Sequence, residues 1–264
     1  MAFRFLTVAA ATLMCAVPPA TAAENADEAP VRTRVALGVQ ATPSAPGASD
    51  LRFGPFIGVS RARAGEDFAF DAPDESFGFP VINLGSVAIG PALSIMGKRT
   101  AGRVDAALPK VSTTFEAGAF VQGYIAPALR LRAEARRGIG GHNGWIGELS
   151  ADLIARDGDK WLLSAGPRVT LNDARYTRAY YGVTPAAALT SGLSVYRPGG
   201  GISAVGVSVG ALKQFGPRWG VAAYARYDRL VGDAADSPIA RGPGSRSQPS
   251  AGIALSYTFG RIRN

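Results

Sequence analysis

The sequence predicts an all-β protein, a transmembrane antiparallel up-and-down β-barrel of about twelve strands, with ten as the fallback. Three observations support this fold class. Segments of about ten residues alternate apolar and polar side chains, as membrane barrel strands do. Short turns alternate with long polar connections, and aromatic residues concentrate at the segment ends, where a membrane interface would place them. A soluble sandwich also alternates, so the turns and the aromatic residues favour the membrane barrel.

The N-terminus predicts export. Arg4 precedes an apolar stretch from Phe5 to Val17, and prolines and small residues follow, which is the layout of a secretory signal peptide. We therefore expect a signal peptide over 1–23, a short leader over 24–30 and one barrel domain over 31–264. The predicted location is the outer membrane of a Gram-negative cell. The only cysteine lies inside the signal, so the mature chain is expected to lack disulfides.

The predicted strands follow the alternation in chain order. In one of them Leu129, Leu131 and Ala133 share a face opposite Arg130 and Arg132. The ten longer strands are expected at 31–41, 51–63, 86–97, 113–125, 128–138, 145–156, 160–171, 202–213, 219–231 and 249–259. Two short candidates, at 67–71 and 78–84, must count together, because single-chain bacterial barrels have an even strand number.

The connections between these strands differ in length on the two sides. Short turns are expected at 126–128, 157–158 and 215–217, and long polar loops at 97–112, 138–144, 172–201 and 232–248. Outer-membrane barrels have short periplasmic turns and long extracellular loops. The short turns are therefore assigned to the periplasmic side.

Charged residues in the middle of the strands fall on the face predicted to line the lumen, whereas Arg61, Arg63 and Arg229 lie on the apolar face near strand ends, where the cost is small. A cation at the bilayer midplane on the lipid face would cost roughly 2–4 kcal/mol, so the inward assignment is the favourable one. The predicted lumen cluster is Arg130, Arg132, Glu134, Arg136, Glu148, Asp152, Arg168 and Arg226. One interpretation is a charge network that fills and stiffens the barrel, and the other is a pore surface that favours anions.

The sequence predicts no catalytic, cofactor or metal site. His142 is the only histidine, and it lies in a glycine-rich stretch that is typical of a surface turn. Asp71, Asp74 and Glu75 are expected in a polar loop, solvated or binding cations, rather than as an acid and base pair. The formal net charge of +8 comes mainly from arginine, which suits fixed, hydrogen-bonded charge better than a nucleic-acid surface. We expect no nucleic-acid partner.

Several strings of the sequence resemble the MipA/OmpV family of outer-membrane proteins. The most specific is the motif Gly232, Asp233, Ala234, Ala235, Asp236, Ser237 and Pro238. Other similar strings lie at 140–144, 166–168, 172–176, 180–184 and 255–259. The chain departs from the usual barrel pattern after Phe259, where five further residues follow the terminal aromatic residue.

The resemblance implies an outer-membrane barrel without catalytic residues. It also implies a scaffold that brings a murein-cleaving lytic transglycosylase together with a murein-synthesising penicillin-binding protein. The expected partners are outer-membrane lipid and these two enzymes. The alternative function, motivated by the arginines of the lumen, is a channel for small anionic solutes.

Overall fold

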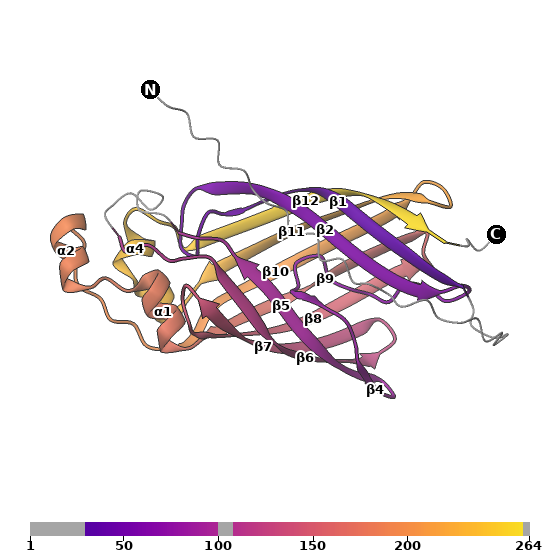
Figure 1. The fold of residues 1–264 in the computed structure, drawn as a ribbon, viewed down its shortest axis with the longest axis horizontal. Coiled ribbons are helices and arrows are strands. Elements are labelled where there is room, and N and C mark those ends of the chain that lie inside the picture. Colours follow the sequence, from indigo (N-terminus) through magenta and orange to yellow (C-terminus); the bar gives the residue numbers. More distant parts are fainter. Residues whose placement is uncertain (1–29, 100–107, 261–264) are drawn as a thin grey trace, which may run out of the picture.

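The computed structural model describes residues 30–99 and 108–260 as a long barrel-shaped sheet with a helical cap at one end (Figure 1). The strands are β1 (Val31–Pro43), β2 (Leu51–Arg63), β3 (Phe77–Gly78), β4 (Ile82–Leu84), β5 (Val87–Met96), β6 (Thr114–Ala126), β7 (Leu129–Gly140), β8 (Trp145–Asp157), β9 (Trp161–Asn172), β10 (Gly201–Gln214), β11 (Trp219–Leu230) and β12 (Ser247–Phe259). The helices are α1 (Ala174–Tyr181), α2 (Pro185–Ser191), α3 (Gly232–Asp236) and α4 (Pro238–Arg241). No helix in this part of the chain is long and apolar enough to span a membrane.

All twelve strands belong to one antiparallel sheet, with neighbours in the order β2-β1-β12-β11-β10-β9-β8-β7-β6-β5-β3, and β4 paired to β5. The sequence-adjacent strands from β5 to β12 pair with one another, which is the predicted up-and-down topology. The first and last strands also meet, with Val35 opposite Tyr257. The expected all-β fold with twelve strands is confirmed, and the ten longer strands lie within a few residues of their predicted bounds.

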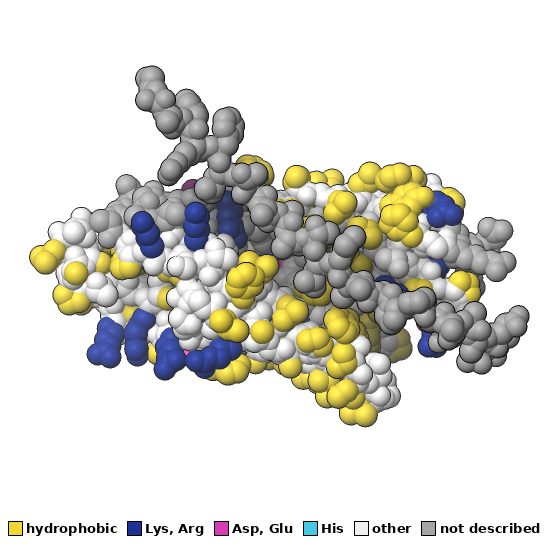
Figure 2. Space-filling model, in the orientation of Figure 1, with side chains coloured by type: hydrophobic (Ala, Val, Ile, Leu, Met, Phe, Trp, Pro, Cys, Tyr) yellow, Lys and Arg dark blue, Asp and Glu magenta, His cyan; other side chains and the backbone are white. Residues whose placement is uncertain are grey.

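The two faces of the sheet differ as the alternation predicts. Large apolar side chains such as Phe53, Ile57 and Leu153 are exposed on the outside, at 82%, 63% and 63% of their surface. Figure 2 shows apolar side chains spread over the outer face of the strands, with many Lys and Arg side chains toward the cap. Most of the buried charged side chains instead lie on the inward face. The interior of the barrel is therefore a charged core.

The two ends of the barrel are built differently. Short turns join β6 to β7, β8 to β9 and β10 to β11 at one end, here called the turn end. The four helices stand at the opposite end, the cap end, where Figure 1 shows them beyond the strands. Trp219, Tyr257 and Phe259 make an aromatic row at the turn end, with neighbouring ring centroids 4.7 Å apart. This row matches an interfacial aromatic belt.

One predicted strand is wrong. Residues 67–71 form no strand but belong to a segment, residues 66–76, that enters the lumen after β2 and is here called the plug. Phe68, Phe70 and Ala72 are each at most 4% exposed in this position. The plug leads into β3 and β4, so the second short candidate supplies both short strands of the sheet. The predicted signal peptide, residues 1–23, lies outside the described residues.

Within the described part of the chain, the sheet does not close into a full ring. Among the described residues, β2 pairs only with β1, and the other margin of the gap is formed by β5 with its short partners β3 and β4. We call this gap the seam. At its cap end the Arg52 side chain crosses toward Gly97 and occupies the space that a Cβ at this glycine would take.

The charged lumen as the candidate functional site

The plug is held at the turn end by backbone and aromatic contacts. The Phe68 backbone N–H donates to the Asp159 Oδ1 atom at 3.0 Å, and Arg32 donates to the Glu66 carbonyl oxygen. The Arg34 guanidinium lies 4.0 Å from the centre of the Phe68 ring. Burying two phenylalanines removes much apolar surface from water, so the plug packs inside the barrel rather than lying in solvent.

Asp74 joins the middle of the plug to the barrel wall. Its carboxylate accepts hydrogen bonds from Arg168 Nε at 2.8 Å and Nη2 at 3.1 Å, which is a bidentate pair. Arg226 Nη1 donates to the same carboxylate at 3.2 Å. The Asp74 and Arg168 side chains are only 3% and 1% exposed. The pair is therefore largely shielded from solvent.

Glu75 makes the next connection between plug and wall. It pairs with Arg130, which also donates to Asp152 Oδ2 at 2.9 Å. Asp152 in turn accepts from Arg168 Nη2 at 2.8 Å. The three strands β7, β8 and β9 and the plug are thus joined through one chain of ion pairs.

The remaining predicted cluster residues extend this network along the lumen. Arg132 pairs with Glu134 at 2.9 Å, and Arg136 pairs with both Glu134 and Glu116. On the opposite wall, Arg226 donates to Glu148 at 2.5 Å. All eight residues of the predicted lumen cluster therefore face the interior and belong to the ion-paired network.

The structure corrects the expectation for the acidic residues of the plug. Asp74 and Glu75 do not lie in a solvated loop, because each is ion-paired inside the barrel with a side chain at most 4% exposed. Asp71 is exposed, but toward a cavity of the lumen rather than at the outer surface of a loop. These carboxylates were not part of the predicted lumen cluster. In the sequence, these acidic residues follow Phe68 and Phe70 in a segment about as long as one strand. This combination is the signal that could have indicated a segment inside the barrel.

The network also explains why the lumen is not a row of free positive charge. Each arginine of the predicted cluster has at least one carboxylate within 3.0 Å. Aromatic rings cover two of them as well, with Arg132 3.8 Å from the Phe120 ring centre and Arg130 4.5 Å from that of Phe70. Such contacts add cation–π attraction to the ion pairs.

The prediction that His142 lies in a surface turn is wrong, because its side chain is buried. Its Nδ1 atom accepts from the Gly144 N–H at 3.1 Å, and Nε2 lies 3.1 Å from Glu116 Oε1. Its ring meets Tyr176 edge-on, with centroids 4.8 Å apart. The histidine thus links the top of the lumen network to the cap.

The family-like motif of residues 232–238 is a structural part of the cap. The Ser237 hydroxyl donates to the Tyr181 carbonyl oxygen at 2.6 Å and accepts from the Ile239 N–H at 3.1 Å, which caps α4. The Asp233 carboxylate accepts from the Gly199 N–H at 2.5 Å. Ala234 is 1% exposed in the apolar cluster of the cap. The motif therefore fastens the long loops to one another.

The helix α1 carries the largest buried side chains of the cap. Asp173 caps its first turn by accepting from the Tyr176 N–H at 2.9 Å, and Arg99 donates to the carbonyl oxygens of Ala179 and Tyr180 at its end. A cation at a helix C-terminus is favourable. Burial raises the pKa of Tyr180 to about 12 and that of Tyr181 further.

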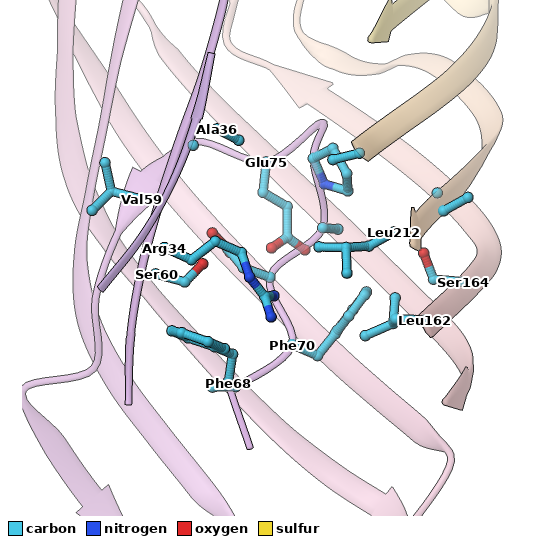
Figure 3. A pocket seen from close by; sticks show the side chains of 18 of the residues that line it. Arg34, Ala36, Val59, Ser60, Phe68, Phe70, Glu75, Leu162, Ser164 and Leu212 are labelled. Atoms are coloured by element: carbon cyan, nitrogen blue, oxygen red, sulfur yellow. The ribbon is translucent and has the colours of Figure 1, made fainter. Parts of the chain in front are cut away.

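Cavities remain in the lumen on both sides of the plug. A chamber of about 920 Å³ lies between plug and cap, with Tyr181 at its upper boundary and Asp74 at its lower one. A smaller cavity of about 180 Å³ lies beside the plug and is drawn in Figure 3. Within residues 30–99 and 108–260, no three His, Cys, Asp or Glu side chains are placed to hold a metal ion.

Comparisons with known proteins give one family and several distant folds. A family model described as MltA-interacting protein MipA matches residues 35–259. No curated protein matches the chain. Among solved structures, an outer membrane channel from Pseudomonas putida F1 is 11% identical, with 94% of this chain and 100% of that chain covered and a TM-score of 0.42. The translocator domain of the autotransporter NalP from Neisseria meningitidis is 14% identical, with 89% and 90% covered and a TM-score of 0.40. TM-scores this low carry no functional inference.

Proposed function

Because the chain belongs to the MltA-interacting protein MipA family and is an outer-membrane β-barrel, we propose that it is a non-enzymatic scaffold for proteins that remodel peptidoglycan. In this role it brings a lytic transglycosylase and a penicillin-binding protein together near the wall. Export by the signal peptide of residues 1–23 is part of the same proposal. The turn end then faces the periplasm, where both enzymes would be met.

The observation that carries the proposal is the lumen obstructed by the plug. The plug occupies the turn-end half of the barrel through buried ion pairs, and the cap lies over the other end. A barrel obstructed in this way is stiff and offers its rim and turns for contact, because the arginines and carboxylates of its network already pair within the chain. These features favour a binding role over transport along the barrel axis.

The test is retention of wall enzymes by the mature protein in detergent. We expect a lytic transglycosylase and a penicillin-binding protein to be retained on a column in moderate salt. An epitope inserted between Pro127 and Ala128, in an exposed turn at the turn end, should lower retention at least tenfold by obstructing the periplasmic rim. The matched insertion after Gly192, in the cap, should leave retention unchanged. Absence of retention, or equal loss with both insertions, would contradict the scaffold.

The alternative from the sequence is a channel for small anions. The row of lumen arginines suggested this channel. The carboxylates paired with those arginines weaken the channel hypothesis, because they neutralise the positive charge. Planar-bilayer recording decides the matter. A channel requires an anion-selective current that changes when Arg130 and Arg132 are replaced by Ser, whereas the scaffold predicts no current from the unaltered chain.

A further inference from the structure

We propose that the barrel binds an uncharged, hydroxyl-bearing single-chain amphiphile, which enters the cavity beside the plug from the membrane through the seam. This proposal does not depend on the scaffold function. It commits to one ligand class, long-chain alcohols and similar uncharged amphiphiles, and to one place, the cavity of Figure 3, here called the seam cavity.

The open edge of β2 gives the seam cavity access to the membrane. Among the described residues, this strand has no hydrogen-bonded neighbour on its side facing the seam. The seam cavity is lined by Ile57 and Val59, whose side chains belong to the outer face and are 63% and 47% exposed. A cavity with lining residues on the lipid-facing side of an edge strand is reached from the bilayer. At the turn end the seam cavity also adjoins a hollow with which it shares Arg34, Phe68 and Asp159, so the seam is its route from the bilayer and the turn end its route from water.

Much of the wall of the seam cavity is apolar. Figure 3 shows Phe68, Phe70, Leu162 and Leu212 around it, with Ala36 on the side of β1. Its volume, about 180 Å³, is similar to that of an engineered apolar cavity that holds benzene. It therefore has room for the polar end of an amphiphile and a few methylene groups. The rest of the chain would lie along Ile57 and Val59 among the lipid.

Two polar side chains at this cavity have unpaired atoms. Arg34 and Glu75 point into it in Figure 3, and their side chains are 9% and 4% exposed. The Arg34 Nε–H and the Glu75 Oε2 atom have no hydrogen-bond partner, although both are buried; the Arg132 Nε atom lies 3.8 Å from Oε2, too far for a hydrogen bond. Unpaired buried polar atoms are costly, so a ligand that satisfies them gains affinity. A hydroxyl group both donates and accepts, as these two atoms require.

The charges around the seam cavity select an uncharged head group. Cations (Arg34 and Arg156) and carboxylates (Asp71, Glu75 and Asp159) both line the seam cavity, and Asp159 already pairs with the two arginines. An ionic head of either sign would add a charge to this paired set in a poorly solvated place, which is costly. An uncharged head avoids this cost. Arg34 is also only three residues from the start of β1 at the turn end, so the polar end would lie toward the interface, as in a membrane leaflet.

The test uses three photoreactive probes in phosphatidylcholine vesicles that contain the mature chain. Dodecanol, dodecanoic acid and dodecylamine each carry a diazirine in the chain, and crosslinked peptides are mapped by mass spectrometry. We expect the alcohol to label the plug saturably, with competition by unmodified dodecanol. The acid and the amine should label the plug about tenfold less than the alcohol. This is the effect expected when one buried polar group is left without a hydrogen bond. Outward-facing Leu149 should be labelled by all three without saturation.

A matched pair of variants locates the site. A Cβ at Gly58 would meet only the Ala36 Cβ, at 3.5 Å, so Gly58→Leu places its side chain in the seam cavity and should lower plug labelling at least tenfold. Gly54→Leu, on the same face of β2 and with nothing within 4 Å of an added Cβ, should leave labelling unchanged. Ala222→Leu, from the opposite wall, serves if Gly58→Leu does not fold. The proposal would be overturned if the plug is not labelled, or if the three probes label it equally. It would also be overturned if Gly58→Leu and Gly54→Leu lower the labelling of the plug by the same factor.

Discussion

Replacing Asp74 by Asn tests whether buried ion pairs hold the plug in the lumen. The substitution keeps the shape of the side chain but removes the charge that Arg168 and Arg226 share. Breaking a buried pair by removing one partner costs roughly 3–5 kcal/mol. Arg168 keeps Asp152 at 2.8 Å, and Arg226 keeps Glu148 at 2.5 Å. We therefore expect the lower end of that range, about 3 kcal/mol of unfolding free energy.

The measurement is urea unfolding of the barrel in detergent, followed by tryptophan fluorescence, beside the control Asp67→Asn. Asp67 lies in the same plug, but its side chain is 48% exposed, and its ion pair with Arg156 is 3.7 Å long. An exposed pair of this kind contributes at most about 1 kcal/mol. A loosened plug should also give Asp74→Asn an anion-selective current that Asp67→Asn lacks. Equal destabilisation by the two substitutions would refute the reasoning.

Further predictions concern the cap and the lipid face. Ser237→Ala removes the hydrogen bond to the Tyr181 carbonyl oxygen and the cap of α4. Chemical denaturation should therefore show a free energy of unfolding lower by about 2 kcal/mol. The control Thr190→Ala, at an exposed position of the cap, should lower it by less than about 0.5 kcal/mol. The pKa of Tyr180 in the fold, about 12, is above its ordinary value of 10.0, so the fold favours the neutral phenol. The contribution of Tyr180 to the free energy of unfolding is therefore complete below pH 10 and is lost as the pH rises toward 12. Tyrosinate absorbance during alkaline unfolding will measure this loss. On the outer face of β6, Val121→Arg at mid-strand should cost roughly 2–4 kcal/mol in refolding into vesicles, whereas Ile125→Arg near the turn end should cost about 0–1 kcal/mol; equal costs would contradict the lipid-facing assignment.

The strands were predictable because their signal is local. Alternation such as that from Leu129 to Arg136 needs only neighbouring residues, and a slip of one residue would put arginines into lipid, so the register is strongly fixed. The same parity identified all eight lumen charges. Their function was not predictable in the same way, because their partners include Asp74 and Glu75, which are more than 50 residues away in sequence from most of them.

The plug shows where local patterns fail. Its alternating Phe68, Phe70 and Ala72 look like a short strand, yet the segment joins no strand ladder. Arg32, Arg34 and Arg130 offer its side chains partners inside the barrel instead. His142 fails for a similar reason. A glycine-rich string is typical of a turn, but Glu116 and Tyr176 reach it from elements distant in sequence and bury it.

The sequence by itself determined the β-barrel, the strand bounds, the outward direction of the apolar side chains and the inward direction of the arginines, because these depend on a period of two within each segment. Only the tertiary structure decided that the arginines are neutralised, that a segment after β2 occupies part of the lumen, and that β2 has no pairing partner at the seam within residues 30–99 and 108–260. These features depend on which distant carboxylates and backbone edges meet in space, and no repeating pattern along the chain encodes such meetings.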